Sequence, residues 1–267
     1  MSLSCRVATT KHELDDALRV RYAVFGKEER LLEGPVPPAP REVDCFDTLE
    51  TTVHLVVYAN DTPVATVRLL LPNPEVARTT GGVLGIDLEQ KLDLSGVGGP
   101  GLVFAESTRF CILKEWRHSE VLMHLQAGLY KESRRHGVTH WIAAANMETD
   151  VAEDARIVYQ LAAHQGLVSP RWHVAPREDT ASPSHPTAPL YTPSQRARAQ
   201  EGKLEGLRMP RVLSLFARKM GARFIAEPLY NAGFQRFTLP LIAVLEEIPP
   251  STLAHFEALD EDASHAA

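Results

Sequence analysis

The chain has 267 residues, a formal net charge of −6 and a hydrophobic share of 44%, values typical of a soluble globular protein. Mild acidity argues against a general nucleic-acid binder. No run of about 18 apolar residues occurs, which argues against a transmembrane helix. The start, MSLSCRVATTKHELDD, lacks the apolar core of a signal peptide, so we expect a cytoplasmic protein.

Metal and disulfide chemistry have little support in the sequence. The three cysteines, Cys5, Cys45 and Cys111, show no metal-ligand spacing and cannot all pair, which predicts reduced thiols. No His-Glu-x-x-His or Cys-x-x-Cys motif is present. We therefore expect no metal site.

The N-terminal region predicts a short strand over 5–9 and a helix over 11–29. A capping box, Thr10 to Glu13, marks where the helix begins. Arg21 lies on the otherwise apolar face of this helix, which is unusual for a surface arginine. After a proline-rich loop over 34–40, two carboxylates, Asp44 and Asp47, flank Phe46.

A β-hairpin is predicted next. Residues 53–58 read as a strand, Asn60-Asp61 as its turn and 64–71 as the return strand, which Arg68 interrupts. The following segment, 72–101, is rich in loop-forming residues, and 86–92 is predicted to contain a short helix.

The stretch Phe104–Ile112 reads as a strand that carries two charges among apolar residues. On a flat strand Glu106 and Arg109 face opposite sides. If both faces are covered, one of the two charges is buried and requires a partner. A charged pair in a central strand is a candidate for chemistry, and a structural ion pair is the alternative.

The second half alternates helices and strands. Ser119 can cap a helix that ends at about Arg135. An apolar strand over 139–147 follows, and Asp150 to Glu153 is predicted to cap the next helix. Residues 176–206 are predicted to be a mobile insertion, and the acidic tail 251–267 is predicted to be disordered. Between them, Pro210 begins a helix that stops at Gly221, and the last strands cover 222–227 and 237–246. The order predicts a mixed sheet in a single α/β domain over 1–250.

Four segments in this order resemble a known signature. They are Arg21-Tyr-Ala-Val-Phe25, Glu42-Val-Asp44-x-Phe46-Asp47, Val67-Arg68-Leu-Leu and Glu106-Ser-Thr-Arg109. The chain is similar to one branch of the GCN5-related N-acyltransferases: the acyl-homoserine-lactone (autoinducer) synthases, the long-chain N-acyl amino acid synthases and the ornithine-lipid N-acyltransferases. The match covers about residues 14–170.

The resemblance implies a fold and a set of functional residues. The fold is a mostly antiparallel central sheet flanked by helices, whose central strand is bulged or splayed near Glu106. A bulge would also re-aim the side chains beyond it. By resemblance Glu106 is the catalytic base and Arg109 orients Glu106 or another acidic group. The same resemblance assigns acceptor binding to Arg21, Phe25, Asp44, Asp47 and Arg68, and acyl or phosphopantetheine binding to Phe104, Ser107, Thr108, Phe110 and Arg117.

The implied donor is an acylated phosphopantetheine, carried by an acyl carrier protein or by CoA, and no tightly bound cofactor is expected. Acetyl-CoA-dependent relatives have a glycine-rich phosphate loop where this chain has Leu113 to Glu120, without glycine. That absence favours a donor with one phosphate, as on a carrier protein. Carrier proteins are acidic, so we expect docking on basic residues near Arg117, Lys131, Arg134 and Arg135. Peripheral membrane contact through a lipid product is left open.

The sequence therefore predicts an N-acyltransferase that moves a medium or long acyl chain to the amine of an amino acid or related small amine. The product would be an N-acyl amino acid or lyso-lipid. Two alternatives remain: an autoinducer synthase, and a non-catalytic domain that binds an acyl carrier protein. Autoinducer synthases have a tryptophan shortly after the position of Phe25, whereas Gly26 to Val43 contains none.

Overall fold

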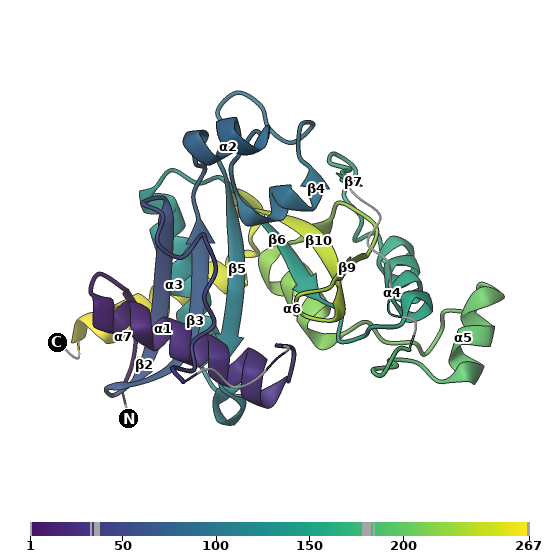
Figure 1. Ribbon diagram of the computed structural model, residues 1–267, viewed down its shortest axis with the longest axis horizontal. Coiled ribbons are helices and arrows are strands. Elements are labelled where there is room, and N and C mark those ends of the chain that lie inside the picture. Colours follow the sequence, from purple (N-terminus) through teal and green to yellow (C-terminus); the bar gives the residue numbers. More distant parts are fainter. Residues whose placement is uncertain (1, 33, 35–37, 178–182, 184, 266–267) are drawn as a thin grey trace.

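The computed structural model describes residues 2–32, 34, 38–177, 183 and 185–265 (Figure 1). Its centre is an eight-stranded sheet. In spatial order the strands are β1 (Leu3–Val7), β2 (Thr52–Ala59), β3 (Thr62–Leu70), β5 (Phe104–Ile112), β6 (His140–Asn146), β10 (Arg236–Val244) and β8 (Arg223–Phe224), and β9 (Leu229–Asn231) pairs with β10. Among these described strands only β5 and β6 run parallel; the other pairs are antiparallel. The predicted mixed, mostly antiparallel sheet is confirmed.

Helices cover both faces of the first half of this sheet (Figure 1). Alternation along β2 explains the two layers, because successive side chains point to opposite faces. Val56 and Tyr58 pack against Ala17 of α1 (Lys11–Tyr22), whereas Leu55 and Val57 join the core under α3 (Val121–Arg135). Helix α1 continues as a π-helix, η1 (Ala23–Glu28), so the predicted helix over 11–29 is confirmed in extent.

Strand β5 is bulged and then leaves its neighbour. Its register with β3 shifts between Thr108, opposite Arg68, and Cys111, opposite Thr66, so Arg109 and Phe110 together oppose one residue. Arg109 has a φ of 56°, the left-handed conformation that a bulge can impose. Pairing with β6 covers only Phe104 to Glu106, although β6 itself continues to Asn146. The predicted bulge and strand separation near Glu106 are confirmed.

The remaining helices are α2 (Pro74–Thr80), the 3-10 helices η2 (Asp87–Gln90), η3 (Lys114–Trp116) and η4 (Leu245–Glu247), α4 (Ala152–His164), α5 (Pro193–Gln200), α6 (Arg211–Met220) and α7 (Pro250–His265). Of these, α4 and α6 contact the second half of the sheet, α5 contacts α4, and α7 packs on α3. A separate pair of short strands joins β4 (Leu92–Asp93) to β7 (Ala175–Pro176). No helix in the described part of the chain is long and apolar enough to span a bilayer.

Two segments that the sequence predicts to be unstructured contain helices. Within 176–206, residues 193–200 form α5, where Arg196 pairs with the buried Asp154 at 2.6 Å; residues 178–182 and 184 lie outside the described part. The prediction of a disordered tail from 251 is wrong for most of its length. Helix α7 begins at Pro250, and Phe256 is buried against Tyr130 of α3 at a ring distance of 5.7 Å. One well-placed aromatic residue thus anchors a weakly patterned segment.

Candidate active site

Glu106 lies where the parallel pairing of β5 and β6 ends. Its side chain is buried, and the carboxylate accepts a hydrogen bond from the backbone N–H of Leu88 at 2.9 Å. Burial raises the pKa of Glu106 to about 8, and the negative charge of Asp87 acts in the same direction. The positive charges of Arg68 and Arg109 oppose this shift. A carboxyl group with a pKa near neutrality is suited to take up a proton during a reaction.

Ion pairs fill the same face of the sheet around Glu106. We use the name charged cluster for seven side chains: Arg21, Glu42, Asp44, Asp47, Arg68, Asp87 and Arg109. Arg21 of α1 binds Asp47 at 2.5 Å, and Arg68 of β3 binds the same carboxylate at 2.8 Å. Arg109 from the bulge reaches Asp44 at 2.6 Å. The cluster therefore connects α1, the loop that follows it, β3, β5 and η2.

The bulge decides which side chains join the charged cluster. A regular strand would direct Arg109 to the face opposite Glu106. The extra residue instead brings Arg109 to the carboxylates of Glu42, Asp44 and Asp87. Of the two predicted roles for Arg109, its contacts fit the orientation of other acidic groups.

Most of the acceptor-binding residues predicted from the sequence come together here. Arg21, Asp44, Asp47 and Arg68 lie in the cluster, and burial of Asp47 is outweighed by its bonds to Arg21, which lower its pKa to about 2. Sequence reasoning did not select Glu42 and Asp87. Glu42 lies in a quoted motif, whereas Asp87 lies in a loop-rich segment with no periodic signal.

Phe234 lies against Arg109, and Phe25 packs on Phe234. Phe234, in the turn between β9 and β10, contacts Phe25 of η1 with ring centroids 4.8 Å apart. The Arg109 guanidinium carbon lies 5.2 Å from the centroid of the Phe234 ring. Phe25, predicted to bind the acceptor, is thus placed beside the charged cluster. Phe234, which the sequence analysis did not select, contacts both.

The opposite face of the sheet carries a narrow apolar cleft between the sheet and helices α3 and α6. Phe110 and Phe216 meet across it with ring centroids 6.1 Å apart. Its cavity volume is about 10 Å³, close to the space of one water molecule. The cleft is lined by Ser107, Phe110, Gln126, Leu129, Trp141, Ala143, Phe216, Met220, Leu241 and Ala243.

The five residues predicted to bind the acyl arm do not form one group. Ser107 and Phe110 line the apolar cleft, and Thr108 lies beside Arg109, its hydroxyl 3.4 Å from the guanidinium. Phe104 instead packs in the core, 4.6 Å from the ring of His140. Arg117 pairs with Glu28 and Glu29 and donates to the carbonyl of Ile112 at 3.1 Å.

The basic residues predicted to dock a carrier protein lie at two ends of α3. Arg117 precedes the helix, whereas Lys131, Arg134 and Arg135 lie in its last turns. A helix of 15 residues is about 22 Å long. The four side chains therefore do not form one continuous surface.

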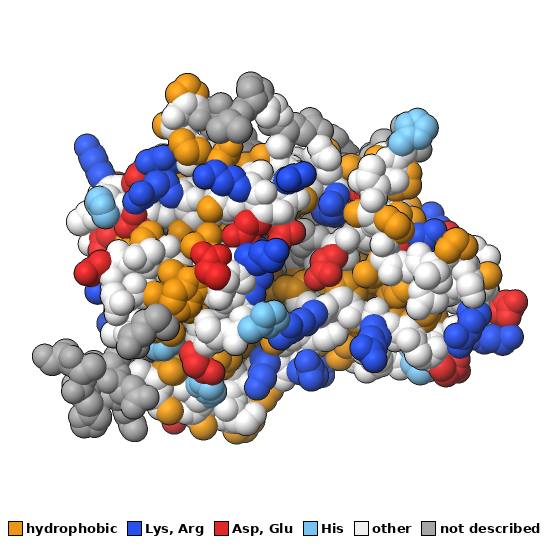
Figure 2. Space-filling view, turned by 90° about the horizontal axis from the view of Figure 1, so that it is seen from below, with side chains coloured by type: hydrophobic (Ala, Val, Ile, Leu, Met, Phe, Trp, Pro, Cys, Tyr) orange, Lys and Arg blue, Asp and Glu red, His pale blue; other side chains and the backbone are white. Residues whose placement is uncertain are grey.

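Figure 2 shows a hollow on the underside of the molecule, with apolar side chains in it and charged side chains of both signs around it.

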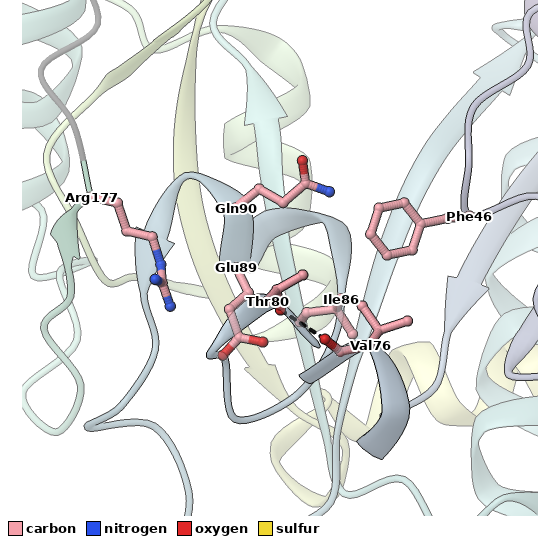
Figure 3. Close-up of a pocket in the computed structure, with 7 residues that line it drawn as sticks. All are labelled: Phe46, Val76, Thr80, Ile86, Glu89, Gln90 and Arg177. Atoms are coloured by element: carbon pink, nitrogen blue, oxygen red, sulfur yellow. Dashed lines mark hydrogen bonds between the residues drawn. The ribbon is translucent and has the colours of Figure 1, made fainter. Parts of the chain in front are cut away.

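A separate pocket of about 260 Å³ lies beside η2 (Figure 3). Phe46 lies in its wall, and the Arg68 guanidinium carbon is 5.9 Å from the centroid of that ring. Glu89, also in the wall, accepts hydrogen bonds from the backbone N–H groups of Val83, Leu84 and Gly85. Glu89 therefore holds the loop before η2 in place.

Comparison with known proteins places these features in a family. The model of the family described as N-acyl amino acid synthase FeeM matches residues 16–150, about half of the chain. This range contains Glu106 and the whole charged cluster. Phe216 and Met220 of the apolar cleft, and Phe234, lie outside it.

Two L-ornithine N(alpha)-acyltransferases are similar in sequence. The protein of Rhizobium meliloti (strain 1021) is 27% identical over 186 residues, which cover 67% of this chain and 61% of that relative. The protein of Agrobacterium fabrum (strain C58) is 26% identical over 181 residues, covering 64% and 59%. The chain thus spans about three fifths of the length of these curated relatives.

One solved structure shares the fold over nearly the whole chain. The crystal structure of TofI in a ternary complex with an inhibitor and MTA superposes with a TM-score of 0.52 at 14% identity. The match covers 97% of this chain and 100% of TofI. At this identity the likeness shows the fold alone.

Proposed function

The chain belongs to the FeeM family of N-acyl amino acid synthases, and from that premise we propose that it is an N-acyltransferase. It moves a medium or long acyl chain from an acylated phosphopantetheine to the amine of an amino acid. L-Ornithine, named for the two relatives, is the first acceptor to test. One observation carries the proposal: Glu106, with a pKa of about 8, lies between the charged cluster and the point where β5 and β6 separate.

The chemistry requires a proton acceptor and a site for negative charge. The amine nitrogen attacks the thioester carbonyl, the C–N bond forms, and the C–S bond breaks to release a thiolate. Glu106 takes the proton that the nitrogen loses, directly or through water. Within the described residues, β5 has no backbone partner on β6 beyond Glu106. The N–H groups on that edge are suited to stabilise the oxyanion of the tetrahedral intermediate.

The charge balance of the site favours a cationic acceptor. Four carboxylates of the cluster face three guanidinium groups, before Glu106 is counted. An excess of negative charge in a partly buried site is costly unless a cation compensates it. L-Ornithine, which carries two ammonium groups and one carboxylate, supplies a net positive charge. A bound cation also favours the ionised form of Glu106, and the ionised carboxylate can accept a proton.

The acyl chain is assigned to the apolar cleft. Its walls are apolar apart from Ser107 and Gln126, and it lies next to the strand separation. Because the cavity holds about one water molecule, a bound chain must displace side chains of α6. Met220 is a flexible residue in that position.

We expect acyl carrier protein to be a better donor than acyl-CoA of the same chain length. The α3 N-terminus, where a pyrophosphate would bind, begins after Glu120, a carboxylate. Arg211 of α6 contacts His118 at 3.3 Å, which places a basic side chain near the start of α3 and suits an acidic carrier. Steady-state kcat/KM for the two palmitoyl donors checks this. A higher value with palmitoyl-CoA contradicts it.

The pH dependence of transfer is expected to report Glu106. Because its carboxyl must be ionised to accept a proton, kcat/KM rises with pH and levels off above about pH 8. The negative charge of Asp87 raises this pKa, so Asp87→Asn should move the rise to lower pH. pH profiles of both proteins, measured with the same acceptor, check this. A rise that stays at the same pH in Asp87→Asn contradicts it.

The raised pKa of Glu106 also predicts how the free energy of unfolding changes with pH. The folded protein keeps Glu106 protonated up to about pH 8, whereas an unfolded chain releases that proton near the ordinary glutamate pKa of 4.5. The contribution of Glu106 to the free energy of unfolding is therefore greatest below pH 4.5 and declines between these values. Denaturant unfolding of the wild type and of Glu106→Gln at a series of pH values measures this trend.

Mass spectrometry of lipid extracts tests the proposed function. A bacterial host that expresses the wild-type chain should accumulate new N-acyl amino acids, and a host that expresses Glu106→Gln should not. The mass of the head group identifies the acceptor. Identical lipid profiles in both hosts and in an empty-vector control would contradict the proposal.

A further inference from the structure

Gln126 is a buried amide without a hydrogen-bond partner in the described part of the chain. The residue is 1% exposed, and neither its side-chain oxygen nor its nitrogen is bonded there. Ser133, on the same helix, shows the usual arrangement. It is 0% exposed, and its hydroxyl accepts the indole N–H of Trp141 at 2.8 Å. Buried atoms of His54, Arg68 and Thr252 also lack a bond, but among these unbonded side chains of the described residues Gln126 is the one that lines the apolar cleft.

An unpaired buried amide destabilises the free protein. It loses its hydrogen bonds to water and gains none in return. An apolar side chain of similar size would pack in the same place without that cost. A role in ligand binding explains the glutamine at this position, because the ligand supplies the hydrogen-bond partner of the amide.

The position of Gln126 identifies that ligand. Its side chain lines the apolar cleft together with Ser107 and Ala143. These two residues directly follow the last pair between β5 and β6, Glu106 with Ile142. A donor whose reacting carbon lies at Glu106, and whose chain enters the cleft, must pass Gln126 close to its thioester.

We infer that Gln126 is a donor-binding residue whose amide hydrogen-bonds a polar group of the acyl-pantetheine near the thioester. This inference rests on the proposed function. A glutamine amide donates and accepts at the same time, so it complements an amide or a hydroxyl group. The partner belongs either to the pantetheine arm, which contains amides, or to an oxygen on the acyl chain.

The test uses Gln126→Met and two donors that cannot be transferred. These are the thioethers of pantetheine with a hexadecyl chain and with a 3-hydroxyhexadecyl chain, titrated by calorimetry. Loss of one buried hydrogen bond is expected to weaken binding about tenfold. In the absence of ligand the same substitution should raise Tm by about 2–4 °C, because the unpaired amide is removed. The substitution is thus expected to lower the affinity for the donor and to raise Tm.

The two ligands distinguish the sources of the partner. Equal weakening of both assigns the partner to the pantetheine arm. Weakening of the 3-hydroxy compound alone assigns it to the acyl chain. Unchanged affinity for both, a lower Tm, or no binding of either thioether to the wild type would overturn the inference.

Gln160→Met is the matched control, because Gln160 lies exposed on α4. It should change neither affinity nor Tm. Because the thioethers bind without reacting, the titration measures donor binding independently of acyl transfer. Gln126-dependent binding without any amide product would refute the proposed function and leave the inference in place.

Discussion

Replacing Glu106 with glutamine is expected to lower kcat by about 10²–10⁴-fold, the range found when a general base is removed. The amide oxygen can still accept the hydrogen bond that the carboxylate receives from Leu88. Glutamine cannot take up the proton, however. The folded protein should be as stable as the wild type or more stable, because a buried group that tends to ionise has been removed. Steady-state kinetics and thermal unfolding of the purified variant check both parts.

Glu89→Gln provides the contrasting control. Glu89 is also a buried carboxylate and directly follows Leu88, which donates to Glu106, but Glu89 accepts from three backbone N–H groups of the loop before η2. Its replacement should lower Tm and leave kcat near the wild-type value at temperatures well below Tm. Full turnover by Glu106→Gln would remove Glu106 from the mechanism. Equal loss of turnover in both variants would show a general disturbance of the site.

Arg21→Met is expected to have the largest effect on stability. Arg21 is 0% exposed and contacts the carboxylates of Glu42 and Asp47. Without it these buried acids lose a cation, and breaking a buried pair in this way costs about 3–5 kcal/mol of the free energy of unfolding. Denaturant unfolding of the purified variant measures the loss.

Arg41→Met is the control for Arg21→Met. Arg41 binds Asp15 at 2.6 Å, and both side chains are partly exposed. Water can solvate Asp15 after the substitution, so little change in stability is expected. An equally small change in Arg21→Met would show that the charged cluster is not needed for folding. The soluble yield of the variant is a second measure, because a marginally stable protein is lost in the cell.

Charges inside apolar elements were the most informative signal in the sequence. Arg21, Arg68, Glu106 and Arg109 each interrupt an apolar pattern. Since a buried charge requires a partner, the sequence predicted a paired charge in the strand over 104–112. The ion pairs of Arg109 with Glu42 and Asp44 fit that expectation. The resemblance implied the bulge, which also re-aims the side chains so that Glu106 and Arg109 can share one face.

The failed Asp150 cap and helix α7 depend on contacts between distant segments, whereas helix α2 has a local signal that the sequence analysis did not use. Asp150 was predicted to cap α4, yet its carboxylate instead accepts hydrogen bonds from the backbone of Thr187 and Ala188. Helix α2 lies in a segment predicted to be loop, where Asn73 and Pro74 are the local start signals. Helix α7 depends on the packing of Phe256. None of these partners is visible in local periodicity.

The positions of the donor-binding residues were the least predictable. Ser107 and Phe110 point into the apolar cleft, whereas Phe104, on the same strand, packs in the core of the other face. The resemblance supplied the strand but not the side of the sheet on which the acyl chain lies. Gln126 gave only a weak sequence signal, because a single glutamine on the apolar face of an amphipathic helix is ordinary. Its significance depends on burial and on the missing partner.

One measurement tests the central claim most directly. Purified protein is mixed with palmitoyl carrier protein and L-ornithine, and in a parallel reaction with palmitoyl carrier protein and S-adenosylmethionine. Tandem mass spectrometry then locates the acyl chain in the products. The proposed function predicts an amide at the α-amine of ornithine, released together with free carrier thiol and absent with Glu106→Gln. An acyl-homoserine lactone in the second reaction, with no amide in the first, would contradict it.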